Sequence, residues 1–163
     1  MRTGGGKAKG SAFERSVCID LSKWVSGGNA RIDLFWRSAL SGGRATVKRG
    51  TVRQAGDITA VAPEGHVLTD NFYLECKHLK NISLDGLIKG KGALINIWAT
   101  TVMEALKYNR VPILIFRQNH WPTIFCTNDS GVISFGVQDR CIRATYRSKE
   151  YPITLNYTNL TIY

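Results

Sequence analysis

The sequence lacks any long apolar run. No stretch approaches the roughly 18 consecutive apolar residues of a membrane-spanning helix. The first ten residues, which are basic and rich in glycine, contain no apolar segment of a secretory signal. No basic amphipathic helix of the kind that lies on a membrane surface stands out. We therefore expect a cytoplasmic protein without a membrane partner.

The cysteines form no recognisable framework. Cys18, Cys76, Cys126 and Cys141 are widely separated, with no CxxC pair and no histidine at zinc-ligand spacing. This pattern indicates neither a zinc site nor a set of disulfides. We expect four buried thiols.

Acidic residues are few. The 163 residues include 12 Asp and Glu against 22 Lys and Arg, a formal net charge of +10. This balance favours a polyanionic partner, and nucleic acid is the first candidate. Apolar side chains make up 44% of the chain, enough for one domain with a core. We expect a flexible basic tail over residues 1–10 and a single domain over residues 11–163, with its core ending near residue 117 and a β extension over residues 118–163.

Periodic apolar residues predict the main elements. Helical spacing marks residues 12–26 and 93–108, and Ser11 with Glu14 has the pattern of a capping box at the start of the first helix. A continuous apolar run over residues 111–116 is typical of a strand buried on both faces. Further short strands are predicted over residues 123–127, 132–137, 142–146 and 153–163.

Two strand-like runs, residues 56–61 and 72–77, carry the candidate chemistry. Side chains alternate along a strand, so Glu75 and Lys77 share one face while Cys76 points to the other. If the two runs pair as an antiparallel hairpin through residues 63–71, Asp57 lies opposite Glu75 and Lys77. Two carboxylates and a lysine then converge. This group suits a hard divalent cation and the activation of a water beside a phosphate.

Basic residues flank these runs. Residues 31–55 hold six cations and one acid, with two aromatic residues interleaved, and three lysines follow the second run. Such segments can lie along a phosphate chain, although solvated loops have the same composition. The candidate DNA-binding residues are Arg15, Arg37, Arg44, Lys48, Arg49, Arg53, Lys80, Lys89 and Lys91.

In this order of elements the sequence resembles the PD-(D/E)XK nuclease superfamily. The motif residues are Gly56-Asp57 and Glu75-Cys76-Lys77, and Glu14 matches an additional helix carboxylate of several branches. The small size, the basic surface and the helix Glu resemble most closely the Holliday junction resolvase branch, archaeal and phage types included. The resemblance covers residues 11–116. Gly56 replaces the Pro of the motif name, and only Asn96, or Lys89 and Lys91, could stand for the polar residue that some branches carry on the second helix.

The resemblance implies an α/β (α+β), restriction-endonuclease-like core. A central mixed sheet would be flanked by helices in the order α-β-β-β-α-β, followed by C-terminal strands. Asp57, Glu75 and the Cys76 backbone carbonyl would ligate Mg²⁺, with Mn²⁺ able to substitute, and Glu14 would ligate a second ion or orient a water. Lys77 would contact the scissile phosphate or the attacking water. The expected partner is branched DNA in the form of a four-way junction, and the expected enzyme is a homodimer. It would act in the cytoplasm, which is the host cytoplasm if the protein is phage-encoded.

Three alternatives remain open from the sequence. The chain could be a nicking, repair or restriction-type nuclease of the same fold. It could also be a non-catalytic nucleic-acid-binding module in which Asp57, Glu75 and Lys77 form a structural ion pair. A Cys76–His78 nucleophile is the third, because both residues point to the same side of the strand.

Overall fold

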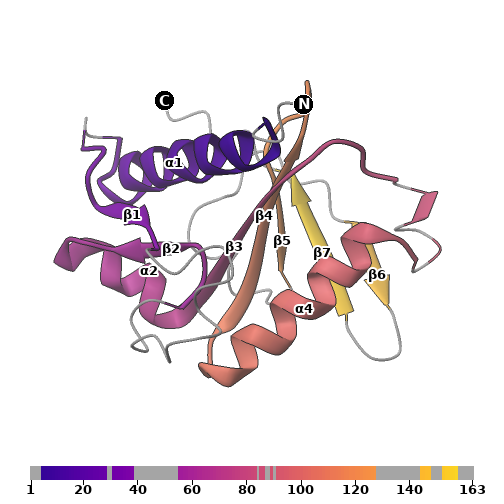
Figure 1. Cartoon of the computed structure of the whole chain (residues 1–163). Helices are drawn as coiled ribbons and strands as arrows, with labels where there is room; N and C mark the ends of the chain where they lie inside the picture. Colours follow the sequence, from indigo (N-terminus) through magenta and orange to yellow (C-terminus); the bar gives the residue numbers. More distant parts are fainter. Residues whose placement is uncertain are drawn as a thin grey trace.

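A mixed sheet with a helix on each face forms the centre of the computed structural model (Figure 1). The structure describes residues 5–28, 31–38, 55–83, 85–86, 89, 91–127, 144–147 and 152–157. The five strands of the mixed sheet lie in the order β3-β4-β5-β7-β6, and β1 and β2 form a separate two-stranded sheet. The elements are α1 (Gly5–Val25), β1 (Phe35–Arg37), β2 (Ile58–Ala60), η2 (Pro63–Gly65), α2 (His66–Asn71), β3 (Phe72–Leu79), α4 (Ala93–Lys107), β4 (Val111–Gln118), β5 (Ile124–Thr127), β6 (Ala144–Arg147) and β7 (Pro152–Tyr157). The predicted core order α-β-β-β-α-β is confirmed, with η2 and α2 inserted before the third strand.

The pairing of β3 with β4 divides the core into two parts. The strands run parallel, so residues in register point to the same face of the sheet. Leu74 and Cys76, opposite Ile113 and Ile115, pack against α1. On the other face, Leu114 and Phe116 pack against α4 around Trp98. Each face of the sheet therefore has its own helix, as the predicted fold requires.

Helix α1 begins earlier than the sequence pattern predicts. It starts at Gly5, so the capping box at Ser11 is wrong, and the part of the predicted tail from Gly5 to Gly10 is helical. The capping-box pattern is a local signal, whereas the helix is held by apolar residues that are buried against the sheet. Ser11 and Glu14 are also tolerated in a helix interior. Residues 1–4 lie outside the described part of the chain.

The predicted hairpin is also wrong. β2 pairs antiparallel with β1, placing Arg37 opposite Ile58, and the chain between β2 and β3 forms η2 and α2 rather than a simple loop. Gly65 packs tightly where these elements meet, because a Cβ there would lie 3.0 Å from the Leu34 carbonyl oxygen. β2 therefore approaches β3 through the residues before it and not as a paired strand.

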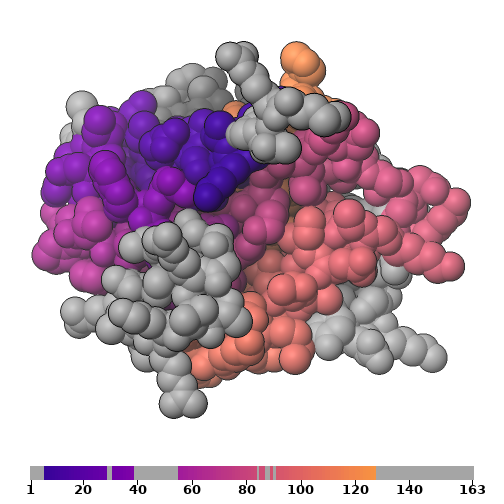
Figure 2. All heavy atoms as spheres, viewed as in Figure 1, coloured from indigo at the N-terminus to yellow at the C-terminus, as the bar shows by residue number. Residues whose placement is uncertain are grey.

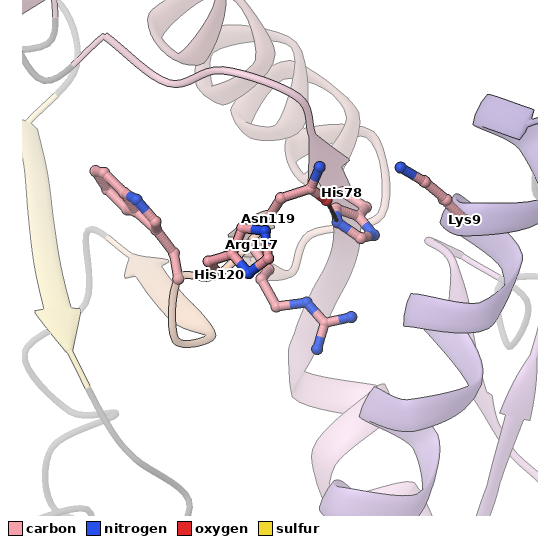
Figure 3. Close-up of a pocket in the computed structure, with 6 residues that line it drawn as sticks. Lys9, His78, Arg117, Asn119 and His120 are labelled. Atoms are coloured by element: carbon pink, nitrogen blue, oxygen red, sulfur yellow. Dashed lines mark hydrogen bonds between the residues drawn. The ribbon is translucent and has the colours of Figure 1, made fainter.

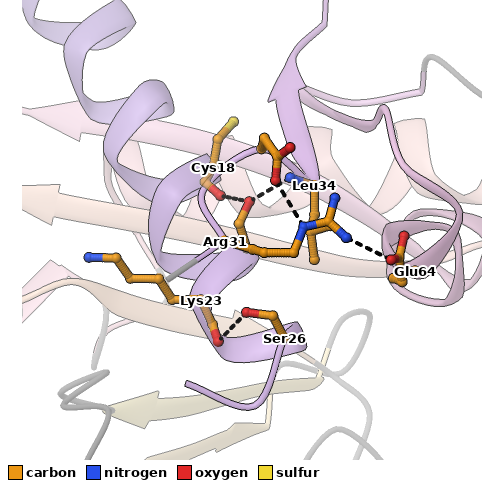
Figure 4. Close-up of polar contacts among 8 residues, drawn as sticks. Cys18, Lys23, Ser26, Arg31, Leu34 and Glu64 are labelled. Carbon is orange, nitrogen blue, oxygen red and sulfur yellow. Dashed lines mark hydrogen bonds and ion pairs between the residues drawn. The ribbon is translucent and has the colours of Figure 1, made fainter. Parts of the chain in front are cut away.

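Polar contacts join the end of α1 to the segment before β1 (Figure 4). The Ser22 hydroxyl donates to the Cys18 carbonyl at 2.7 Å and accepts the Leu34 amide at 3.2 Å. The Arg31 guanidinium donates to Asp33 at 3.1 Å and to Glu64 at 2.7 Å. The Ser22 contact therefore joins the start of β1 to α1, and the contact of Arg31 with Glu64 joins the same segment to η2.

The remaining predictions agree with the structure where it describes them. α4 and β4 fall where predicted, and β5, β6 and β7 overlap three of the predicted short strands. Cys18, Cys76 and Cys126 are free and buried. The predicted strand over residues 132–137 and Cys141 lie outside the described residues. No helix in the described ranges is long and apolar enough to cross a membrane.

Candidate active site

Asp57 lies at the outer edge of β3 and is held there by three hydrogen bonds, two through its own backbone and one through its carboxylate. Its amide donates to the Leu74 carbonyl at 2.8 Å, and its carbonyl accepts the Ser38 amide at 2.8 Å. Its Oδ2 accepts the backbone amide of Cys76 at 2.9 Å. β3 is an edge strand of the five-stranded sheet, so this free edge is where the loop before β2 can dock. The sequence predicted that Asp57 meets β3, although by a different route.

Gly56 makes this close approach possible. Its φ is +86°, and a Cβ at this position would lie 2.6 Å from the Leu74 carbonyl oxygen. A side chain is excluded by both the backbone conformation and the contact. Proline, which the motif name has here, fixes φ near −65° and could not adopt this conformation. The departure from the motif therefore has a structural reason in this chain.

Glu75 and Lys77 extend from β3 toward α4, on the face opposite Cys76. The Lys77 amine donates to Glu75 Oε1, and the Tyr73 hydroxyl lies 3.4 Å from Glu75 Oε2. The Glu75 side chain is 18% exposed and that of Lys77 38% exposed. The predicted shared face is confirmed, and both charged groups are partly shielded from water.

The electrostatics of Asp57 are unusual. Burial, and secondly repulsion by Glu75, raise the pKa of Asp57 to about 7, although the Cys76 amide and Lys77 favour its charged form. Burial lowers the pKa of Lys77, but the attraction of Glu75 outweighs it and the net direction is upward. Lys77 is therefore charged at neutral pH. The charge of Lys77 therefore does not offset the burial of Asp57 and its repulsion by Glu75.

Glu14 forms an ion pair with Arg37. Its Oε2 accepts the Arg37 Nε at 2.5 Å, and its side chain is 14% exposed. Arg37 precedes Ser38, which bonds the Asp57 carbonyl, so this ion pair lies beside the Asp57 loop. Within the described residues, no three His, Cys, Asp or Glu side chains form a group that could hold a metal ion. The pair of Asp57 and Glu75 is thus the candidate metal-binding set.

A groove between β3 and α4 opens at this site. It has a volume of about 320 Å³, and on the face shown in Figure 2 atoms of the β3 segment are visible between those of α1 and α4. Asn96, one of the residues predicted to stand for the second-helix polar residue, lines it, and Lys89 instead pairs with Asp85 at 2.9 Å. The groove is lined by Tyr73, Glu75, Lys77, Asn96, Ile97, Thr100, Thr101 and Glu104.

Sequence reasoning missed the contribution of Thr100 and Glu104 to this groove. Together with Asn96 they recur every four residues, which places them on one side of a helix. That spacing was the available signal, but a polar helix side is usually only solvated.

The predicted DNA-binding residues divide into three groups. Arg15, Lys80 and Lys91 are exposed, and Lys89 and Arg37 are engaged by acids. Arg44, Lys48, Arg49 and Arg53 lie outside the described residues.

The cysteine nucleophile is disfavoured by the structure. Burial, and secondly Asp57, raise the pKa of the Cys76 thiol well above its usual range, so the thiol stays protonated. His78 Nε2 lies 2.9 Å from Asn119 Oδ1 and is not paired with the thiol.

Comparison with known proteins gives one family match. A family model described as "Phage putative PDDEXK endonuclease" matches residues 5–160. Searches of curated proteins and of solved structures give no match. Since the family model spans nearly the whole chain, including the Asp57 loop, β3 and α4, the chain belongs to this phage PDDEXK endonuclease family.

Proposed function

We propose that this protein is a Mg²⁺-dependent DNA endonuclease that hydrolyses phosphodiester bonds. The observation that carries the proposal is the buried Asp57 carboxylate, anchored on the Cys76 amide beside Glu75 and Lys77. Membership of the family implies a nuclease with DNA as substrate, and PDDEXK nucleases generally use divalent metals. The metal ion, the form of the DNA and the catalytic residues are part of what we propose.

The donor set fits a hard divalent cation. Mg²⁺ is usually held by one or two carboxylates and keeps several waters for substrate phosphates. Asp57 and Glu75 would hold it, and the Cys76 backbone carbonyl is the proposed neutral donor. Burial and repulsion by Glu75 oppose the ionisation of Asp57, and a bound cation would relieve both effects. When bound, the ion lowers the pKa of a coordinated water and offsets charge on the phosphate.

The other residues have proposed roles of their own. Lys77, held against Glu75, would contact the scissile phosphate and favour the negative charge that develops in the transition state. Glu14, which accepts the Arg37 Nε, would ligate a second ion or orient a water. The exposed Arg15, Lys80 and Lys91 would contact DNA phosphates. The same role is proposed for Lys89, Arg44, Lys48, Arg49 and Arg53.

Cleavage assays test this assignment. Asp57→Ala, Glu75→Ala and Lys77→Ala are each expected to lose at least about 10³-fold in Mg²⁺-dependent cleavage while keeping DNA binding. Mn²⁺ should restore activity to the wild-type protein after EDTA treatment. The matched control is Asp85→Ala, which removes an exposed carboxylate that pairs with Lys89. Full cleavage by an Asp57→Asn protein would overturn the assignment.

For the substrate, we propose four-way DNA junctions cut by a homodimer. The support is the resemblance to the resolvase branch, together with the basic composition. Two symmetric cuts require two active sites, so a dimer is expected by light scattering. A monomer that cuts linear duplex as fast as junctions would exclude this substrate while leaving the nuclease proposal intact, and would favour a nicking, repair or restriction-type enzyme.

A non-catalytic DNA-binding module is the second candidate, and the contact between Lys77 and Glu75 is what favours it. An ion pair of this kind can be purely structural. In that case DNA binding persists in EDTA, Mg²⁺ does not raise the melting temperature, and no metal supports cleavage.

A further inference from the structure

We propose that a second pocket, at the far end of β3, binds an unpaired nucleotide of the DNA substrate. The pocket has a volume of about 480 Å³ and lies between the first turns of α1 and the turn that joins β4 to β5 (Figure 3). This inference rests on the proposed nuclease function and specifies the form of DNA that the protein would bind. The pocket is lined by Lys9, His78, Arg117, Asn119, His120 and Trp121.

The charge of the pocket is positive, because its lining includes two cations and no acid. Neither Lys9 nor Arg117 has a carboxylate within 4.0 Å in the part of the chain that the structure describes, and Asp20 interacts with Arg117 only from beyond that distance. By contrast, Arg31, Arg37 and Lys77 all pair with acids. Cations left without acidic partners in one concave place favour an anionic ligand, and on a nuclease the anion at hand is a DNA phosphate.

The cationic wall is held in position by Phe13. The Arg117 guanidinium carbon lies 4.8 Å from the centre of the Phe13 ring, and the His78 ring centre lies 5.8 Å from the same ring. His78 Nδ1 is buried and has no hydrogen-bond partner among the described residues. A buried polar atom without a partner is costly, and the walls of ligand sites are places where such atoms occur.

The turn that closes the pocket is also fixed. His120 has a φ of +64°, and the Trp121 amide donates to the Gln118 carbonyl at 3.0 Å. Gln118 Oε1 accepts the amide of Ile82 at 2.5 Å, which joins the turn to the segment after β3. The pocket is therefore shaped before any ligand arrives.

The remaining lining groups specify a base and not only a phosphate. Trp121 and His120 offer aromatic rings, and base stacking on aromatic side chains is a main source of affinity for single strands. Asn119 uses Oδ1 toward His78, so its amide nitrogen can donate to a base. A base inside a duplex is already stacked on both faces. Only an unpaired nucleotide can present its face to these rings.

The pocket and Glu75 lie on opposite faces of β3. His78 is three residues from Glu75 along the strand, so its side chain lies against Phe13 of α1 while Glu75 faces α4. A nucleotide bound in the pocket would therefore belong to a strand that leaves the duplex and passes around the end of β3, which favours opened or branched substrates.

Fluorescence polarisation tests this with two labelled probes in EDTA: a blunt duplex, and a splayed duplex of equal length with three unpaired nucleotides per arm. We expect the wild-type protein to bind the splayed probe about tenfold more tightly. Trp121→Ala should lose this preference without changing the slope of log affinity against log salt. Arg117→Gln should weaken binding and reduce the magnitude of that slope by about 0.7 to 0.9, the value for one phosphate contact.

Controls separate folding and charge from the pocket itself. Arg31→Gln removes the same charge from an exposed residue that pairs with Asp33 and Glu64, and should leave the preference unchanged. Trp121→Phe should keep it. If Trp121→Ala or Arg117→Gln melts early, the exposed Lys9→Gln takes its place and should lower both the affinity and the slope. Equal binding of both probes by the wild-type protein, or a preference unchanged in the pocket variants, would overturn the inference.

A cleavage assay in Mg²⁺ distinguishes this result from a failure of the proposed function. If no DNA is cut but the preference depends on Trp121, the nuclease proposal fails and the pocket assignment stands. If DNA is cut and the preference for the splayed probe is absent, the nuclease proposal stands and the pocket assignment fails.

Discussion

The two faces of β3 have opposite characters. On the α1 face, Leu74 and Cys76 are buried among apolar side chains. On the α4 face, Glu75 and Lys77 open onto a groove. The same eight-residue strand therefore supplies core packing with one set of alternate residues and a candidate reaction site with the other. Asp57 lies at the edge of the strand. It is buried like the residues of the α1 face, and it is ionisable like Glu75 on the α4 face.

The sharpest test of this comparison is the pH dependence of stability in metal-free protein. The pKa of Asp57 is about 7 when folded against an ordinary value of 3.8, so the folded state binds the proton more tightly. This group's contribution is therefore fully present below about pH 4, falls as pH rises to 7, and is absent above. The loss is at most about 4 kcal/mol, since each pKa unit is worth about 1.4 kcal/mol.

Urea unfolding in EDTA at several pH values measures it. The Asp57→Asn protein should lack this pH-dependent contribution to the free energy of unfolding, and it should be more stable than the wild-type protein at pH 8. Addition of Mg²⁺ should reduce this difference in stability. Asp85→Asn, at an exposed carboxylate, is the control. An identical pH profile for the wild-type and Asp57→Asn proteins would place Asp57 in a solvated environment instead.

The next largest effect should separate the two faces directly. Leu74→Ala on the α1 face is expected to cost about 3 kcal/mol of unfolding free energy through loss of buried surface and the cavity left behind. Lys77→Ala on the α4 face should change stability by less than about 1 kcal/mol, because its amine is partly solvated. Cleavage should show the reverse, with Lys77→Ala inactive and folded Leu74→Ala active. Similar losses of unfolding free energy in both variants would mean that the two faces of β3 contribute equally to stability.

Gly56→Ala probes the edge between the faces. The new Cβ meets the Leu74 carbonyl at 2.6 Å in a left-handed backbone conformation, so about 2 to 3 kcal/mol of stability should be lost and cleavage should fall with the displacement of Asp57. Gly27→Ala is the matched control: its φ is +67°, but nothing lies within 4 Å of a Cβ there. It should cost about 1 kcal/mol, with cleavage unchanged. Equal losses would mean that backbone conformation, and not the approach to β3, sets the requirement.

The smallest effect is expected at Tyr73→Phe. Its hydroxyl lies 3.4 Å from Glu75, too long for a strong hydrogen bond. Thermal unfolding should shift by less than about 0.5 kcal/mol, and the cleavage rate should stay within about threefold. A loss above tenfold in cleavage would give the hydroxyl a direct part in the reaction.

Much of this arrangement could be predicted because it depends on periodicity. Alternation along β3 places Glu75 and Lys77 together whatever β3 pairs with, and the apolar run of β4 could hardly be exposed. The pairing of β2 could not be predicted, since three residues carry little register information and Asp57 reaches β3 through a loop. The start of α1 was missed for a similar reason: a local cap pattern competed with burial of the whole helix. The β4–β5 turn gave no periodic signal at all.

The contact between Asp57 and the Cys76 amide has a consequence for solubility. An exposed edge strand can pair with the edge of another chain, and proteins cover such edges or place charge on them. Here Asp57 covers the edge of β3, since its carboxylate occupies the outward Cys76 amide and its own amide donates to the Leu74 carbonyl. Asp57→Ala should therefore self-associate more readily than Asp57→Asn, which keeps an oxygen acceptor. Static light scattering on the two metal-free proteins would show whether the residue proposed for catalysis also keeps the chains apart.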